Sequence, residues 1–68
     1  MFAAHQYNQD NLAMTGHVEI YKADNIADAV KAVIYSHSID GKEGELYVGP
    51  TGRVVHGAKF GYSIIPAK

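Results

Sequence analysis

The chain of 68 residues contains no cysteine, and it has no apolar run long enough to cross a membrane. Without cysteine it forms no disulfide and no cysteine-ligated metal site, which is compatible with a reducing compartment. A membrane-spanning helix needs roughly 18 consecutive apolar residues, so we expect no transmembrane segment. The N-terminal stretch lacks both a basic start and a long apolar core, so we expect no secretory signal. These absences favour a cytoplasmic protein.

An excess of charge of either sign is also missing. Six lysines and arginines against seven acidic residues give a formal net charge of −1. Proteins that bind the nucleic-acid backbone usually carry a clear positive excess, so a nucleic-acid partner is not favoured. The hydrophobic content of 47% is normal for a folded protein. We therefore expect one small domain over residues 1–68, with marginal stability because so short a chain buries little surface.

The clearest local pattern predicts a single amphipathic helix over residues 24–38. Its apolar stripe consists of Ile26, Ala29, Val30 and Val33, and His37 continues it at helical spacing. Either Asp24 or Asn25 would cap the helix, because their side-chain oxygens accept hydrogen bonds from the free N–H groups of the first turn. An apolar stripe of this kind packs against another element.

The rest of the chain is typical of short strands. Alternation and β propensity predict strands over residues 2–8, 17–22, 45–48, 53–56 and 59–65. Pro66 should end the last strand because it has no N–H to donate. The order β-β-α-β-β-β predicts an α+β domain in which one helix packs on one face of an antiparallel sheet. The other face of the sheet is then open.

The glycine-rich stretch from Tyr47 to Gly57, "YVGPTGRVVHG", invites comparison with phosphate-binding loops. A P-loop requires a following helix and a lysine next to serine or threonine, and neither is present. Pro50 and Gly52 instead suit a tight turn. We predict a hairpin turn, and the alternative is an anion or partner contact through Arg53 at its base.

Metal binding and catalysis have weak support in the sequence. The histidines are His5, His17, His37 and His56. No two are four residues apart, and zinc needs three or four convergent ligands, although His5 and His17 could meet across the first hairpin. Ser36 and Ser38 flank His37, but neighbours on a helix point in different directions. We expect no metal site, no cofactor and no enzymatic activity.

Tyrosines and carboxylates suggest a binding face. In the strand over 17–22, Val18 and Ile20 are expected to face the core, which turns His17, Glu19 and Tyr21 outward. The strand over 45–48 repeats this pattern, with Leu46 and Val48 inward. The predicted partner-binding residues on the open face and its hairpin are Glu19, Tyr21, Glu45, Tyr47 and Arg53. Tyrosine is enriched at protein interfaces. The alternative is that these tyrosines reflect ordinary β propensity.

The segment "HVEIYKADNIADAVKAVIYS", residues 17–36, resembles the strand-to-helix unit of certain type I anti-CRISPR proteins. The similar features are the alternating Val18 and Ile20, the capped helix start and the inward residues of the helix. The resemblance implies a double-stranded-RNA-binding-domain-like build. It further implies a non-enzymatic phage inhibitor that blocks a host nucleoprotein complex by covering its surface.

Two other functions stay open at this point. One is a small nucleic-acid-binding module that uses the basic residues Lys22, Lys31, Lys42, Arg53 and Lys59. The other is a structural subunit that completes its sheet by forming a homodimer. A basic face would favour the first, and self-association would favour the second.

Overall fold

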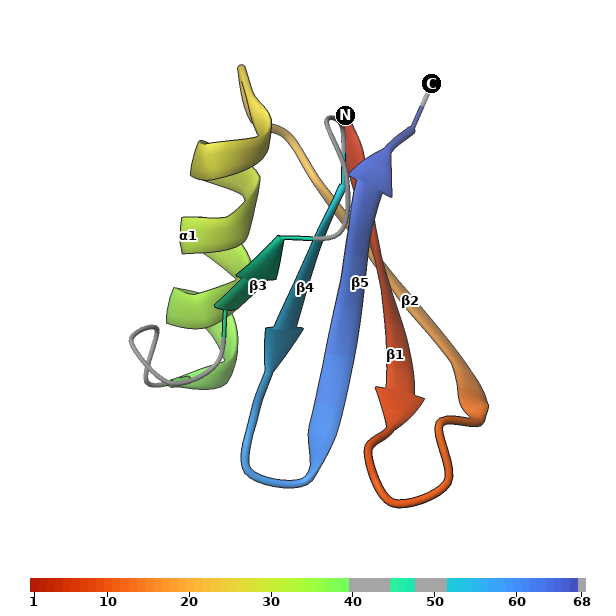
Figure 1. Ribbon diagram of the computed structural model, residues 1–68. Coiled ribbons are helices and arrows are strands. Elements are labelled where there is room, and N and C mark those ends of the chain that lie inside the picture. Colours follow the sequence, from red (N-terminus) through yellow and green to blue (C-terminus); the bar gives the residue numbers. More distant parts are fainter. Residues whose placement is uncertain (40–44, 48–51, 68) are drawn as a thin grey trace.

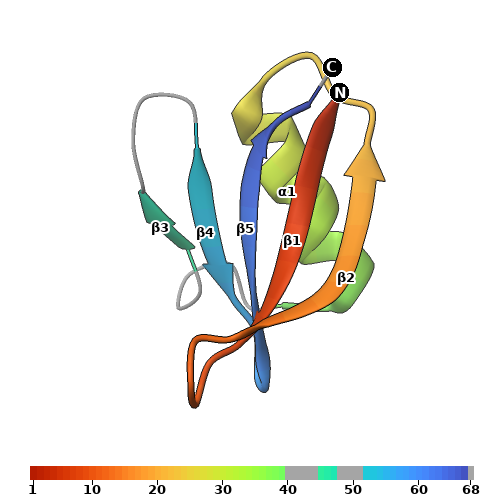
Figure 2. The same cartoon turned by 90° about the vertical axis from the view of Figure 1, so that its right-hand side faces the viewer.

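The computed structural model describes residues 1–39, 45–47 and 52–67 of the chain. It contains β1 (Phe2–Asn8), β2 (Met14–Tyr21), α1 (Ile26–His37), β3 (Glu45–Tyr47), β4 (Arg53–His56) and β5 (Phe60–Pro66). The strands form one antiparallel sheet in the order β2-β1-β5-β4-β3, and α1 lies against one face of it (Figures 1 and 2). The predicted α+β class and element order are confirmed.

The helix begins and ends at well-defined caps. The side chain of Asn25 accepts a hydrogen bond from the Asp28 N–H at 2.9 Å, so Asn25 rather than Asp24 is the N-cap. Ser38 ends the helix in the left-handed conformation, with φ of 54°, and its N–H bonds the carbonyls of Ile34 and Tyr35. These local bonds occupy the backbone groups that a helix terminus otherwise leaves unpaired.

The core lies between α1 and the sheet. It consists of Ala29, Val30 and Val33 from the helix and Ala4, Val55, Tyr62 and Ile64 from the strands. The predicted inward positions of the helix are therefore confirmed. Phe60, Tyr62 and Ile64 share the helix side of β5, because alternate residues of a strand point to the same face.

The predicted orientation of β2 is wrong. Val18 and Ile20 are 45% and 59% exposed, whereas Tyr21 packs against the core. The register explains the reversal: Ala4 pairs with Glu19 on one side and with Ile64 on the other. Residues opposite one another across paired strands share a face, so Glu19 lies on the helix side together with Ala4 and Ile64.

Two features of β2 account for this outcome. It is an edge strand, so the helix covers its inner positions only partly, and polar residues are tolerated there. The last turn of α1 also supplies His37, which binds Glu19 directly. Alternation divides a strand into two sets of residues, but the contacts made by neighbouring elements decide which set faces the core.

Candidate functional site

The open face of the sheet exposes several large apolar side chains. Its exposed large side chains are Met14, Val18 and Ile20 on β2 and Ile65 on β5, with exposed fractions from 43% to 59%. The register aligns them in rows across the sheet: Ile20–Ala3–Ile65 and Val18–His5–Ser63–Val54. Within β1, β2, β4 and β5, the residues on this face include no aspartate, glutamate, lysine or arginine. An exposed apolar face without charge is typical of an interaction surface.

On the same face, the ring of Tyr7 packs against Gly61. A Cβ at Gly61 would lie 2.2 Å from Cζ of Tyr7, so the tyrosine ring occupies the space that a side chain would need. The same ring meets His56 edge-on, with 6.2 Å between centroids. The group that approaches Gly61 is therefore a side chain and not the backbone of another strand. The glycine lets Tyr7 lie flat across the sheet.

The opposite face carries a polar cluster centred on Glu19. One carboxylate oxygen lies 2.7 Å from Nε2 of His17, and the other lies 2.7 Å from Nε2 of His37 and also accepts from the Tyr21 hydroxyl. The cluster joins the edge strand β2 to the last turn of α1. It therefore secures the end of the helix to the edge of the sheet.

The environment of Glu19 favours its charged form. Partial burial acts to raise its pKa, but hydrogen bonds from Tyr21, His17 and His37 and the charge of His37 outweigh burial and lower the pKa to about 2. Burial and the hydrogen bond to the Glu19 carboxylate both raise the pKa of Tyr21. The carboxylate is therefore ionised and the phenol protonated at neutral pH.

A line of hydrogen bonds continues from this cluster across the sheet. His37 stacks on Tyr62 with ring centroids 4.3 Å apart, and its Nδ1 lies 3.3 Å from the Tyr62 hydroxyl. Gln6 donates to that hydroxyl at 3.1 Å and accepts from Thr15 at 2.7 Å. Both ring nitrogens of His37 are thus engaged within the fold. The sequence offered no signal for this line, since its members are separated by up to 56 positions.

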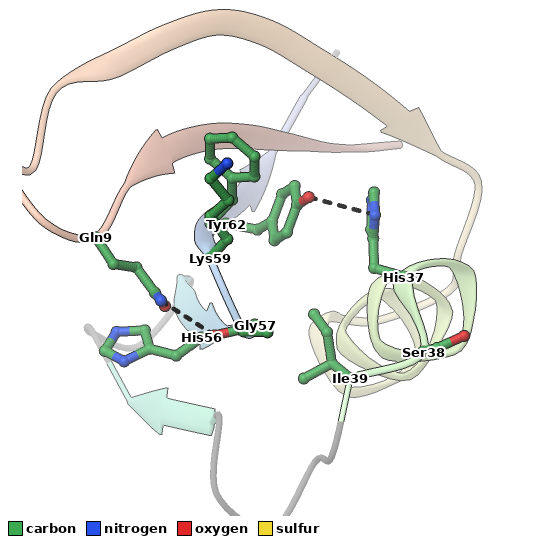
Figure 3. A pocket seen from close by; sticks show the side chains of 10 residues that line it. Gln9, His37, Ser38, Ile39, His56, Gly57, Lys59 and Tyr62 are labelled. Atoms are coloured by element: carbon green, nitrogen blue, oxygen red, sulfur yellow. Dashed lines mark hydrogen bonds between the residues drawn. The ribbon is translucent and has the colours of Figure 1, made fainter.

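A cavity of about 600 Å³ opens at the end of the sheet near the helix C-terminus. Figure 3 shows it between Gln9, the turn at Gly57, Tyr62 and the end of α1. Gln9 Nε2 donates to the Gly57 carbonyl at 3.0 Å, and its Oε1 is buried without a partner. Lys59 is the charged residue of the lining, and its ammonium lies 5.9 Å from the Phe60 ring centroid.

The structure separates the residues predicted to bind a partner. Glu19 and Tyr21 lie on the helix side, so they do not belong to the open face. Arg53 is half-buried and donates to the Gly52 carbonyl at 3.1 Å. For β3 the backbone pairing places Glu45 opposite Val55 and Tyr47 opposite Arg53. The alternation of β2 predicts Val18 and Ile20 in the core, so the sequence gives no signal for the apolar rows of the open face.

Some of the residues named in the predictions lie outside the described part of the chain, and the histidines lie within it. Lys42 and the predicted inward Val48 lie outside the described residues, as do residues 48–51 of the glycine-rich stretch. His5 pairs with Val18 on the open face, whereas His17 binds Glu19 on the helix side, so the predicted meeting of these histidines is wrong. Within residues 1–39, 45–47 and 52–67, no group of three or more histidine, aspartate or glutamate side chains is arranged to hold a metal ion.

Fold and surface together define a small α+β protein with one covered and one open sheet face. Among the described residues, no helix has the length and apolar character needed to cross a membrane. No protein-family model, curated protein or solved structure matches the chain.

Proposed function

We propose that this chain is a non-enzymatic binding protein whose open sheet face contacts a protein partner. The observation that carries the proposal is the exposure of Met14, Val18, Ile20 and Ile65 on one uncharged face. Removing such side chains from water is favourable, and no charge within these strands has to be desolvated at the same time. The centre of a protein interface has this composition: apolar residues with few charges.

The polar side chains of the cluster around Glu19 form hydrogen bonds with one another, and this supports a binding role over a catalytic one. Glu19 and His37 form an acid–base pair, but they bond to each other and to Tyr21 and Tyr62. A general base needs a nitrogen or oxygen within reach of a substrate proton. Both nitrogens of His37 already have partners, so the pair suits a structural role better than a catalytic one.

The proposed partner is a host nucleoprotein complex, and this part of the proposal rests on the resemblance to type I anti-CRISPR proteins. An uncharged face fits a protein component of such a complex better than its nucleic acid. The described basic residues of the rival nucleic-acid module come from separate segments: Lys22 after β2, Lys31 in α1, Arg53 in β4 and Lys59 in the β4–β5 turn. Arg53 already bonds within the fold.

A titration tests the proposal. Increasing amounts of the protein are added to a purified type I effector complex, and the binding of its DNA target is measured by gel shift. We expect stoichiometric inhibition by the wild type and at least roughly tenfold weaker inhibition by Ile65→Asp, because an apolar anchor is replaced by a charge. Tyr35→Asp is the matched control, since Tyr35 is 89% exposed on α1, away from the open face.

The outcomes separate the two parts of the proposal. No inhibition by the wild type refutes the nucleoprotein partner. Equal inhibition by Ile65→Asp and the wild type refutes the open face as the contact surface. Circular dichroism of each variant must first show the wild-type spectrum.

A further inference from the structure

The open face also suits a second copy of the same chain. We propose that in the absence of another partner two copies pack their open faces together as a symmetric dimer with two sheets face to face. This inference rests on the proposed function, because it names one partner of the same surface. It would leave α1 on the outside of each copy, since the helix lies on the other side of the sheet (Figure 2).

The limited core of one copy favours such an arrangement. Among the residues whose side chains the structure describes, the buried cluster on the helix side has seven members, and two of them are alanines. A domain of fewer than about 70 residues rarely gains much stability from one core. Two packed open faces would create a second apolar layer between sheets about 10 Å apart, which is the usual spacing of stacked sheets.

The area of the face is compatible with a weak dimer. Four strands at about 4.8 Å spacing and about six residues at roughly 3.4 Å each make a face of about 400 Å² in flat projection. Two copies together would bury about 800 Å² in flat projection. Because side chains protrude from the sheet, the accessible surface they bury is larger and approaches the roughly 1,000 Å² of the smallest specific interfaces. We therefore expect reversible dimerisation that depends on concentration.

The chemistry of the face is complementary to itself. In a symmetric dimer each residue meets the same set of residues on the other copy, so a like charge near the axis would repel. The strands present Met14, Val18, Ile20 and Ile65 without any carboxylate, ammonium or guanidinium group. The polar residues in the rows, His5 and Ser63, can be uncharged and can both donate and accept hydrogen bonds. Lipid headgroups are a poorer match because these strands offer no basic residue on this side.

Sedimentation velocity of the protein alone tests the dimer, over concentrations from low micromolar to near millimolar. We expect the wild type to change from monomer to dimer over this range. Ile65→Asp and Ile20→Asp should each raise the dimer dissociation constant at least roughly tenfold, while Tyr35→Asp should leave it within about threefold. A wild type that stays monomeric throughout would overturn the proposal.

Ile65 and Ile20 together distinguish the proposed packing from pairing between edge strands. Ile20 lies on the edge strand β2, whereas Ile65 lies on the central strand β5. Loss of the dimer in Ile20→Asp alone would mean that two β2 edges pair, and this result overturns face-to-face packing. Where an aspartate variant fails to fold, concentration-dependent amide shifts of the wild type take its place, and shifts confined to β2 would likewise refute face-to-face packing.

Different results would refute the dimer and the partner-binding role of the open face. A monomeric wild type whose inhibition is abolished by Ile65→Asp keeps the partner-binding face and removes the dimer. A dimer broken by Ile65→Asp, together with undiminished inhibition by that variant, keeps the dimer and removes the partner-binding role of the face. If the open face both binds the partner and forms the dimer, inhibition per copy should decline at concentrations where the dimer forms, because a second copy then occupies the face.

Discussion

Replacing Glu19 with glutamine removes the charge at the centre of the cluster that joins β2 to α1. The carboxylate accepts from Tyr21, and its oxygens lie 2.7 Å from the bonding nitrogens of His17 and His37. Glutamine keeps the size of the side chain but offers one acceptor oxygen and no charge. We expect Glu19→Gln to destabilise the protein at neutral pH without changing its fold.

The size of the effect follows from the pKa of Glu19. Its fall from 4.5 to about 2 would correspond to about 3.5 kcal/mol of stability, because one pKa unit is about 1.4 kcal/mol. Solvent reduces this value, since the Glu19 side chain is 21% exposed and that of His17 is 52% exposed. We therefore expect a loss of about 1–2 kcal/mol in the free energy of unfolding. For a domain of this size, each kcal/mol shifts the melting temperature by roughly 4–8 °C.

The pH dependence has a definite sign. A group whose pKa is lower in the folded state stabilises the protein fully above its unfolded pKa, and this contribution disappears as the pH falls through the folded value. The wild type should therefore lose stability between pH 4.5 and about 2. Glu19→Gln should lose less over that interval, so the two stabilities should converge at the acid end.

Urea denaturation at pH 7, 5, 4, 3 and 2 measures both quantities. Asp10→Asn is the matched control, because Asp10 lies exposed in the turn between β1 and β2, and a surface change there should alter stability by less than about 0.5 kcal/mol. A Glu19→Gln variant as stable as the wild type at pH 7 would refute the stabilising role of the cluster. A destabilisation that stays constant down to pH 2 would refute its electrostatic origin.

Three further expectations concern the core, a close contact and metal. Val30→Asp should abolish folding, because Val30 is 2% exposed and a buried unpaired charge costs several kcal/mol. The same change at the exposed neighbour, Lys31→Asp, is the control. A cooperative melt of Val30→Asp would contradict the core assignment. Gly61→Ala should cost about 1–3 kcal/mol in urea denaturation and much less in a Tyr7→Ala background, since the added Cβ meets the Tyr7 ring; equal costs in both backgrounds would contradict that contact. A chelator should leave the melting temperature unchanged, and purified protein should contain no stoichiometric zinc; a chelator-dependent melt would reveal a metal site.

The sequence determined the local elements of this protein. Apolar residues at helical spacing and a side-chain cap fix α1, and the inward positions Ala29, Val30 and Val33 follow from that spacing. The strands β1 and β4 coincide with the predicted residues 2–8 and 53–56. These features depend on interactions within a few residues, such as caps, turns and periodicity, so they can be inferred without knowing what lies across the sheet.

The tertiary structure decided which side of each strand faces the core. The alternation of residues 17–21 is equally consistent with Val18 or with Glu19 facing inward, and the choice depends on Ala4, on Ile64 and on the end of the helix. A side chain as polar as Glu19 is tolerated on the helix side because it lies on an edge strand and finds His37, which is 18 positions away. The apolar residues of β2 then lie on the open face. That long-range pairing, and the surface that results from it, cannot be inferred from a local pattern because a strand has two faces of equal geometry.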